Sequence, residues 1–157
     1  MEPRFNFYAS PVAGKVVKFI NSAAKAVEGA GLPAEIPNLV LLRASQINGC
    51  GFCTDMHYKD AVHAGEDPVR LNLVAAWREA VPFTGAERAA LALTEEGTRI
   101  ADAQTGIDAG VWDAAREEFD DDQLAGLISV IAVINAYNRL NVLAGSPAGG
   151  YTAGQYA

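Results

Sequence analysis

The chain has 157 residues, about the size of one domain, and half of them are hydrophobic, which is enough to form a substantial core. Its formal net charge of -7 opposes binding to the phosphate backbone of nucleic acids and to anionic membrane surfaces, so we expect neither as a partner. The first ten residues lack the basic and apolar regions of a signal peptide, which favours a cytoplasmic location.

Apolar residues recur at spacings of three and four along the chain, whereas alternation of apolar and polar residues is scarce. This pattern predicts an all-α protein, a compact bundle of about six to seven helices. Because no repeat or linker divides the sequence, residues 1–157 are expected to form a single domain.

Two helices are predicted in the first third of the chain. The first lies within residues 10–31 and carries Val12, Val16 and Phe19 on one face. The second covers residues 38–49, beginning after a proline and ending at an Asn-Gly pair.

Three further helices are predicted in the second half, each with a capping residue at its start. One begins at Thr84, where Glu87 three residues later completes a capping box. Another begins at Asp108, and the last begins at one of the acids in residues 120–122.

The last predicted helix is apolar around most of its circumference from Leu124 to Ile134. This stretch is shorter than the roughly 20 residues that cross a membrane. We therefore expect a helix at the centre of the bundle or in a subunit interface, and hence a homo-oligomer. Asn135 and Asn138 within it are expected to form buried or interface hydrogen bonds. Residues 146–157 are expected to form a loop or an arm on a neighbouring subunit.

Reactive side chains concentrate in the stretch CGFCTDMH, residues 50–57, which holds both cysteines and one of the two histidines. Residues 49–64 have helical spacing, and a rotation of about 100° per residue puts Cys50, Cys53 and His57 on one narrow stripe. A thiol in the first turn feels the positive end of the helix dipole, and an imidazole one turn away can exchange its proton. The stripe therefore has the parts of a thiol redox centre.

Two other interpretations of this stretch stay open. Buried cysteines can act simply as small hydrophobic side chains. The three side chains also offer three ligands to zinc, but a structural zinc site requires four, and no second pair of cysteines or histidines exists in the chain. We expect neither a metal nor a cofactor, and we assign no role to His63, which points away from the stripe.

Three parts of the chain resemble the alkyl hydroperoxidase D and carboxymuconolactone decarboxylase family: residues 39–66, 75–98 and 134–142. The most specific element is SQINGCGFCTDMH, and the resemblance covers nearly the whole chain. It implies an all-helical subunit that assembles into trimers or hexamers. It also implies reduction of hydroperoxides by the cysteine pair, with electrons from a lipoyl-bearing protein or another dithiol.

The resemblance also assigns roles to single residues. Cys53 matches the cysteine that attacks the peroxide, and Cys50 matches the cysteine that resolves the sulfenic acid as a disulfide. His57 matches the histidine of a proton relay. Dipole reasoning alone favours Cys50 as the stronger thiolate, whereas the family pattern favours Cys53, and we follow the family pattern.

Two positions depart from the family pattern. Its relay commonly includes a glutamate twelve residues before the first cysteine, and here that position is Asn38, which can hold a water but cannot accept its proton. A histidine that can lie between the cysteines is replaced by Phe52. Glu35, Glu95 and Glu96 are candidates for the missing carboxylate. The decarboxylase branch generally lacks the cysteine pair, so its lactone chemistry is not implied.

The sequence thus predicts a cofactor-independent peroxidase in which a hydroperoxide is the substrate and an external dithiol restores the cysteine pair. Two other functions use the same residues. One is a redox-sensing or assembly oligomer without turnover, and the other is thiol-disulfide exchange on protein substrates.

Overall fold

In the computed structural model, which describes residues 2–103 and 106–156, the chain is helical and contains no strand within those residues. The α-helices are α1 (Pro11–Ala26), α2 (Glu35–Ile47), α3 (Gly51–His63), α4 (Pro68–Leu73), α5 (Gly85–Thr98), α6 (Ala109–Glu118) and α7 (Asp121–Ala144). The 3-10 helices are η1 (Phe7–Ala9), η2 (Val27–Ala30), η3 (Val74–Glu79) and η4 (Ile100–Asp102). The predicted all-α fold is confirmed.

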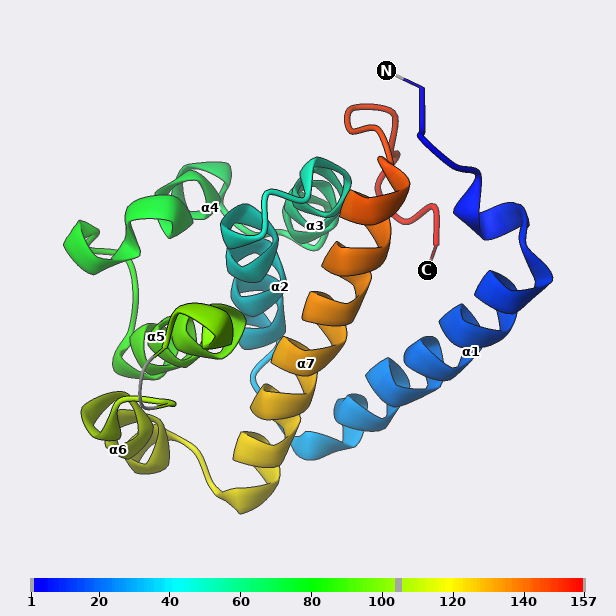
Figure 1. Cartoon of the computed structure of the whole chain (residues 1–157). Helices are drawn as coiled ribbons and strands as arrows, with labels where there is room; N and C mark the ends of the chain where they lie inside the picture. Colours follow the sequence, from blue (N-terminus) through cyan, green and yellow to red (C-terminus); the bar gives the residue numbers. More distant parts are fainter. Residues whose placement is uncertain (1, 104–105, 157) are drawn as a thin grey trace.

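The bundle is arranged around α7, which runs diagonally through it between α1 on one side and α2 with α5 on the other (Figure 1). Two apolar clusters form the core, and α2 and α5 contribute to both. One cluster joins them to α6 and α7 and includes Val40 and Leu127. The other joins them to α3, α4 and η3 and includes Leu42 and Leu71.

The central helix α7 is longer than the apolar stretch that the sequence suggested. It has 24 residues, and among the described residues it is the one helix long and apolar enough to cross a membrane, with mean hydropathy 1.4. Inside the bundle, 44% of that apolar window is buried. A buried core helix of a folded bundle has the same length and composition.

The predicted helix starts are confirmed where capping residues marked them. Thr84 and Glu87 form a reciprocal capping box at the start of α5, and Asp120 forms another with Gln123 at the start of α7. The side chain of Asp108 accepts backbone N–H groups in the first turn of α6.

The remaining boundaries differ from the prediction for physical reasons. Helix α2 begins at Glu35, so that Pro37 lies in its first turn, where a missing N–H does no harm. The segment α4 to η3 was not predicted because each piece has six residues, too few to show a helical period, although Asp67 caps α4.

Among the described residues, much of the apolar face predicted for the first helix is exposed. Val12 and Phe19 each have 71% of their surface exposed, and Val16 is exposed as well. Helix α1 contacts α7 and η2, and Ala13 is its buried residue.

The C-terminal segment forms a loop on α3 of the same chain, which is one of the two forms expected for it. Lys59 donates to the carbonyl oxygen of Tyr151 at 2.9 Å. The hydroxyl of Tyr151 and the backbone N–H of Gly154 both donate to the carboxylate of Asp60. These contacts hold the tail beside the helix that carries the cysteines.

Candidate active site

The cysteines lie at the start of α3, directly after a tight turn from α2. Gly49 has φ of 65°, a left-handed conformation that favours glycine, and it reverses the chain between the two helices. Cys50 is the N-cap of α3, and its Sγ accepts the backbone N–H of Cys53 at 3.3 Å. The first cysteine is thus held by the end of the helix itself.

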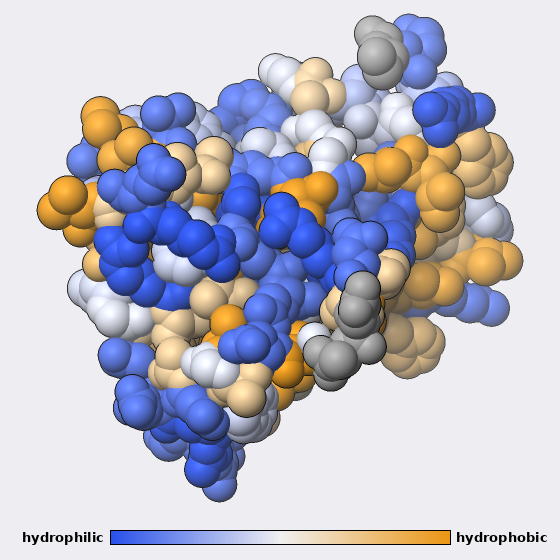
Figure 2. Space-filling view, turned by 60° about the vertical axis from the view of Figure 1, so that its left-hand side comes forward, coloured by the Kyte–Doolittle hydropathy of each residue, from blue (hydrophilic) through white to orange (hydrophobic). Residues whose placement is uncertain are grey.

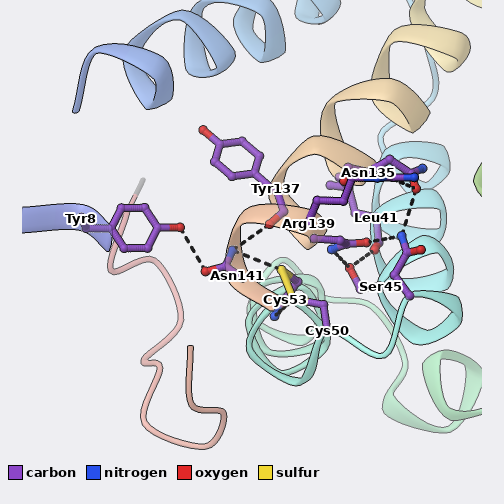
Figure 3. The surroundings of a disulfide bond; sticks show 11 residues. Tyr8, Leu41, Ser45, Cys50, Cys53, Asn135, Tyr137, Arg139 and Asn141 are labelled. Atoms are coloured by element: carbon purple, nitrogen blue, oxygen red, sulfur yellow. Dashed lines mark hydrogen bonds between the residues drawn. A yellow bond between two sulfur atoms is a disulfide. The ribbon is translucent and has the colours of Figure 1, made fainter. Parts of the chain in front are cut away.

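A hydrogen-bonded network anchors this turn to α7. Asn48 Nδ2 donates to Oδ1 of Asn135 and of Asn138, at 2.9 Å each. Asn138 in turn donates to the hydroxyl of Ser45, which donates to the carbonyl oxygen of Leu41 (Figure 3). The prediction that the asparagines of α7 form buried hydrogen bonds is confirmed, and these bonds position the turn before Cys50.

Cys50 and Cys53 are joined as a disulfide, with their Cα atoms 5.4 Å apart. They are 2% and 1% exposed, so both sulfur atoms lie beneath the surface. Neither cysteine is free, and the separation of their Cα atoms lies within the usual range for a disulfide. This geometry fits a redox pair, and it favours that interpretation over the alternative of two cysteines that act only as small hydrophobic side chains of the core.

Asn141 of α7 is a neighbour of the cysteines that the sequence analysis missed. Its Nδ2 lies 3.5 Å from Sγ of Cys53 and donates to it. Its Oδ1 accepts the hydroxyl of Tyr8, which reaches the site from the N-terminal segment (Figure 3). No local sequence signal marks this contact, because Asn141 and Cys53 are 88 residues apart.

His57 follows Cys53 by one turn of α3 and keeps only partial contact with solvent. Burial lowers its pKa to about 4, and the nearby charge of Asp60 opposes this shift only in part. The imidazole is therefore neutral at pH 7 and can accept a proton. Asp60 lies three residues further along α3, and it is the acid whose charge influences the pKa of His57. Because residues three apart on a helix are neighbours, this pair could have been identified from the sequence.

The other candidate carboxylates have different partners. Glu95 accepts hydrogen bonds from Trp77 at 2.9 Å and from Arg43 at 2.8 Å, and it pairs with Arg78. Burial alone would raise the pKa of Glu95, but these donors outweigh it and lower that pKa. Glu95 is thus the centre of an ion-pair cluster.

Three further positions of the predicted relay lie on α2 and α5. Glu96 accepts the backbone N–H of Asp108 at the start of α6. Glu35 is exposed in the first turn of α2, and Asn38 is partly buried one turn later on the same helix. None of these three side chains has a hydrogen bond to His57 among the described contacts.

An open groove of about 660 Å³ borders the cysteine turn on the side of α2 and α4. Its lining includes Gly49 and Gly51, the residues on either side of Cys50. Thr54 and Tyr58 line it from α3, one turn apart. The groove thus borders the two neighbours of the first cysteine in the chain, whereas Asn141 contacts the second cysteine.

Comparisons with known proteins identify a family and a fold for this chain. The sequence profile of the carboxymuconolactone decarboxylase family matches residues 15–96, which include the cysteine turn and all of α3. The uncharacterized protein YdfG of Bacillus subtilis (strain 168) is 31% identical over 148 residues, which cover 94% of this chain and 98% of YdfG.

Solved structures share the fold. ATU0492 of Agrobacterium tumefaciens, a protein of unknown function for which an antioxidant defence role as an AhpD has been suggested, has a TM-score of 0.86 and 34% identity, covering 96% of this chain and all of that one. The debrominase Bmp8, at 17% identity, has a TM-score of 0.76 over 87% of this chain and 73% of its own. The second likeness extends to the fold alone.

Proposed function

Because the chain belongs to the carboxymuconolactone decarboxylase family and resembles its alkyl hydroperoxidase D-like members, we propose that it is a thiol-dependent peroxidase. A hydroperoxide is the substrate, and an external dithiol, such as the lipoyl group of a protein, is the reductant. The observation that carries this proposal is the Cys50 to Cys53 disulfide at the start of α3, with the neutral imidazole of His57 one turn away.

In the oxidative half of the proposed cycle, the Cys53 thiolate attacks one oxygen of the hydroperoxide. The O–O bond breaks, the alcohol leaves after taking a proton, and Cys53 becomes a sulfenic acid. Cys50 then attacks the sulfur of Cys53, water leaves, and the disulfide forms. We assign the proton transfers of these steps to His57, whose imidazole is neutral at pH 7.

In the reductive half, the dithiol delivers two electrons and two protons and leaves as its own disulfide. We propose that it enters through the groove beside Gly49 and Gly51 and attacks the sulfur of Cys50. Burial of both sulfur atoms supports small or extended reductants over folded protein substrates, since a folded surface does not reach sulfur beneath the surface.

We also propose that the protein works as a homo-oligomer, a trimer or hexamer, in the cytoplasm. The support is the exposed apolar face of α1. On the face shown in Figure 2, hydrophobic residues likewise gather along the right-hand side, beside a largely hydrophilic centre.

The decisive experiment is consumption of an organic hydroperoxide with dihydrolipoamide as reductant, comparing the parent protein with Cys53→Ser. The parent should turn over many times per active site and Cys53→Ser should not. His63→Gln, a substitution at the exposed end of α3, is the matched control and should retain activity.

Two results would contradict the peroxidase proposal. Equal rates for the parent and Cys53→Ser would remove the cysteine from the reaction. Formation of the disulfide without turnover would favour the redox-sensing oligomer. Mass spectrometry after thiol trapping separates this second case, because the disulfide form is lighter by two hydrogens.

A further inference from the structure

The carboxamide of Asn141 is placed against the sulfur of Cys53 and is itself almost completely buried. One N–H of Nδ2 donates to that sulfur at 3.5 Å, and the other donates to the carbonyl oxygen of Tyr137 at 3.1 Å. Oδ1 accepts from the hydroxyl of Tyr8 at 3.0 Å. Both ends of the amide therefore have partners (Figure 3).

These partners determine which end of the amide faces the sulfur. In the flipped orientation the amide oxygen would face the carbonyl oxygen of Tyr137, and two acceptors would be opposed. The N–H group that points at Cys53 is thus fixed by its surroundings and does not depend on the oxidation state of the cysteine.

Tyr8 reaches this position because the N-terminal segment is tied to the end of α7. The backbone N–H groups of Arg4 and Phe5 both donate to the carbonyl oxygen of Ala144, at 2.9 and 3.3 Å. Burial raises the pKa of Tyr8, although its hydrogen bond to Asn141 acts in the opposite direction. The phenol therefore keeps its proton near neutral pH and remains a donor.

We propose that Asn141 is a catalytic residue, the hydrogen-bond donor that stabilises the thiolate of Cys53, and that Tyr8 is a positioning residue that holds the amide. The proposal deepens the peroxidase function and rests on it for its consequence in turnover. A charge-assisted hydrogen bond is stronger than one between neutral groups, so the contact stabilises the thiolate more than the thiol or the disulfide.

The same contact assigns the leaving group of the reductive step. When an external thiolate attacks Sγ of Cys50, the S–S bond breaks and its electron pair passes to Sγ of Cys53. The N–H of Asn141 is already in place for that charge. The second thiol of the reductant then attacks the mixed disulfide, and Cys50 leaves and takes a proton.

The test measures Cys53 alone, in the Cys50→Ser background. Serine is a favoured N-cap, so this background keeps the start of α3 intact. The ultraviolet absorbance of the thiolate, recorded against pH, reports thiolate formation without requiring a reagent to reach the buried sulfur. Alkylation by iodoacetamide at about pH 7 gives a second reading.

Asn141→Leu and Asn141→Asp should move the midpoint of thiolate formation to higher pH, and Tyr8→Phe should move it in the same direction by less. Alkylation should slow roughly three- to tenfold in the Asn141 variants, because a more basic thiolate is scarcer but more nucleophilic. The matched control is Tyr137→Phe, since the hydroxyl of Tyr137 also donates to an asparagine, Asn21, but away from the cysteines. Its midpoint should equal that of the parent.

The outcomes separate this inference from the peroxidase proposal. An unchanged midpoint in Asn141→Asp and Tyr8→Phe, both folded by circular dichroism, overturns the role of Asn141 whatever the peroxidase assay shows. A shifted midpoint in a protein that does not consume peroxide supports the role of Asn141 and overturns the peroxidase function. Asn141→Asp keeps the shape of the side chain, so the test does not depend on Asn141→Leu folding.

Discussion

The ring of His57 links the chemistry of the site to the stability of the fold. Its pKa is about 4 in the folded protein, against 6.5 for an unperturbed histidine. Between these values the unfolded chain binds a proton that the folded protein does not bind. The free energy of unfolding therefore falls as the pH decreases through this window.

For the oxidised protein, the contribution of His57 to the free energy of unfolding should fall by about 2 kcal/mol between pH 7 and pH 5. Urea unfolding at both pH values should show this decrease in the parent and a smaller one in His57→Gln. His63→Gln should keep the decrease of the parent. An equal decrease in the parent and His57→Gln would mean that His57 binds a proton as readily in the folded protein as in the unfolded chain.

Asn38 offers a second test at this scale, because the family resemblance implies a relay glutamate at its position. Asn38→Glu should raise the rate of hydroperoxide reduction, since general acid-base assistance is typically worth about 10²- to 10⁴-fold. The assay with dihydrolipoamide over a range of pH would measure both the rate and its optimum. Asn38→Gln, which adds length without a charge, is the control.

An unchanged rate for Asn38→Glu in a folded protein would point to Asp60 as the relay acid. That residue lies one turn beyond His57 and already influences its pKa. Asp60→Asn would then be expected to slow the reaction more than it slows thiol alkylation.

At the residue scale, the sequence predicts which functional residues lie together on one helix, but it does not predict contacts between different helices. Cys50, Cys53 and His57 are brought together by spacing alone, and the structure places all three on α3 or at its cap. The contacts of Tyr8 and Asn141 span sequence separations of 133 and 88 residues, and no periodicity encodes them.

At the scale of elements, the crossing of η2 over α7 depends on a residue without a side chain. A Cβ at Gly126 would lie 2.5 Å from Cβ of Ala30 and 3.3 Å from a methyl group of Leu32. Glycine at this position therefore allows η2 and α7 to approach closely.

Gly126→Ala should lower the free energy of unfolding by about 1–3 kcal/mol, because the new methyl group clashes at this crossing. Gly14→Ala is the matched control: it lies in α1 with no atom within 4 Å of the added Cβ, and it should stabilise by up to about 1 kcal/mol. Ala30→Gly combined with Gly126→Ala should recover stability. A stabilising Gly126→Ala, measured by urea unfolding, would contradict the close approach.

Element boundaries were predictable where a side chain caps the helix. The capping box of Thr84 forms as predicted, and the acid that caps the last helix is Asp120, within the predicted residues 120–122. The pair α4 and η3 was not predictable, since its fold is set by apolar contacts such as those of Leu71 and Trp77 with α2 and α5. Tertiary packing, not local propensity, forms these short helices.

At the scale of the whole molecule, the all-helical fold follows from the spacing of apolar residues, but the use of α1 does not. The predicted apolar stripe of α1 exists in the structure and faces outward. The spacing of apolar residues thus identified this face of the helix, but it could not identify the surface that covers it. We propose that a second subunit covers these exposed valine and phenylalanine side chains.

We expect the parent protein to sediment as a trimer or a larger assembly at micromolar concentration. The double variant Val12→Asp with Phe19→Asp should dissociate it, because carboxylates do not enter an apolar interface. Val81→Asp is the matched control, since Val81 is 92% exposed in the connection before α5. A monomeric parent would contradict the oligomer, and an unchanged double variant would place the interface elsewhere.

The hydrogen bond from Tyr8 to Asn141 joins residues 133 positions apart, and this separation has a kinetic consequence. Contacts that close long loops form late in folding, after the local helices have paired. The hydrogen bonds that complete the active site should therefore be absent from the folding transition state. Tyr8→Phe should accelerate unfolding and leave the folding rate nearly unchanged, with a φ-value close to zero. The amide of Asn141, which contacts the sulfur of Cys53, would then be held by Tyr8 only after the rest of the bundle has folded.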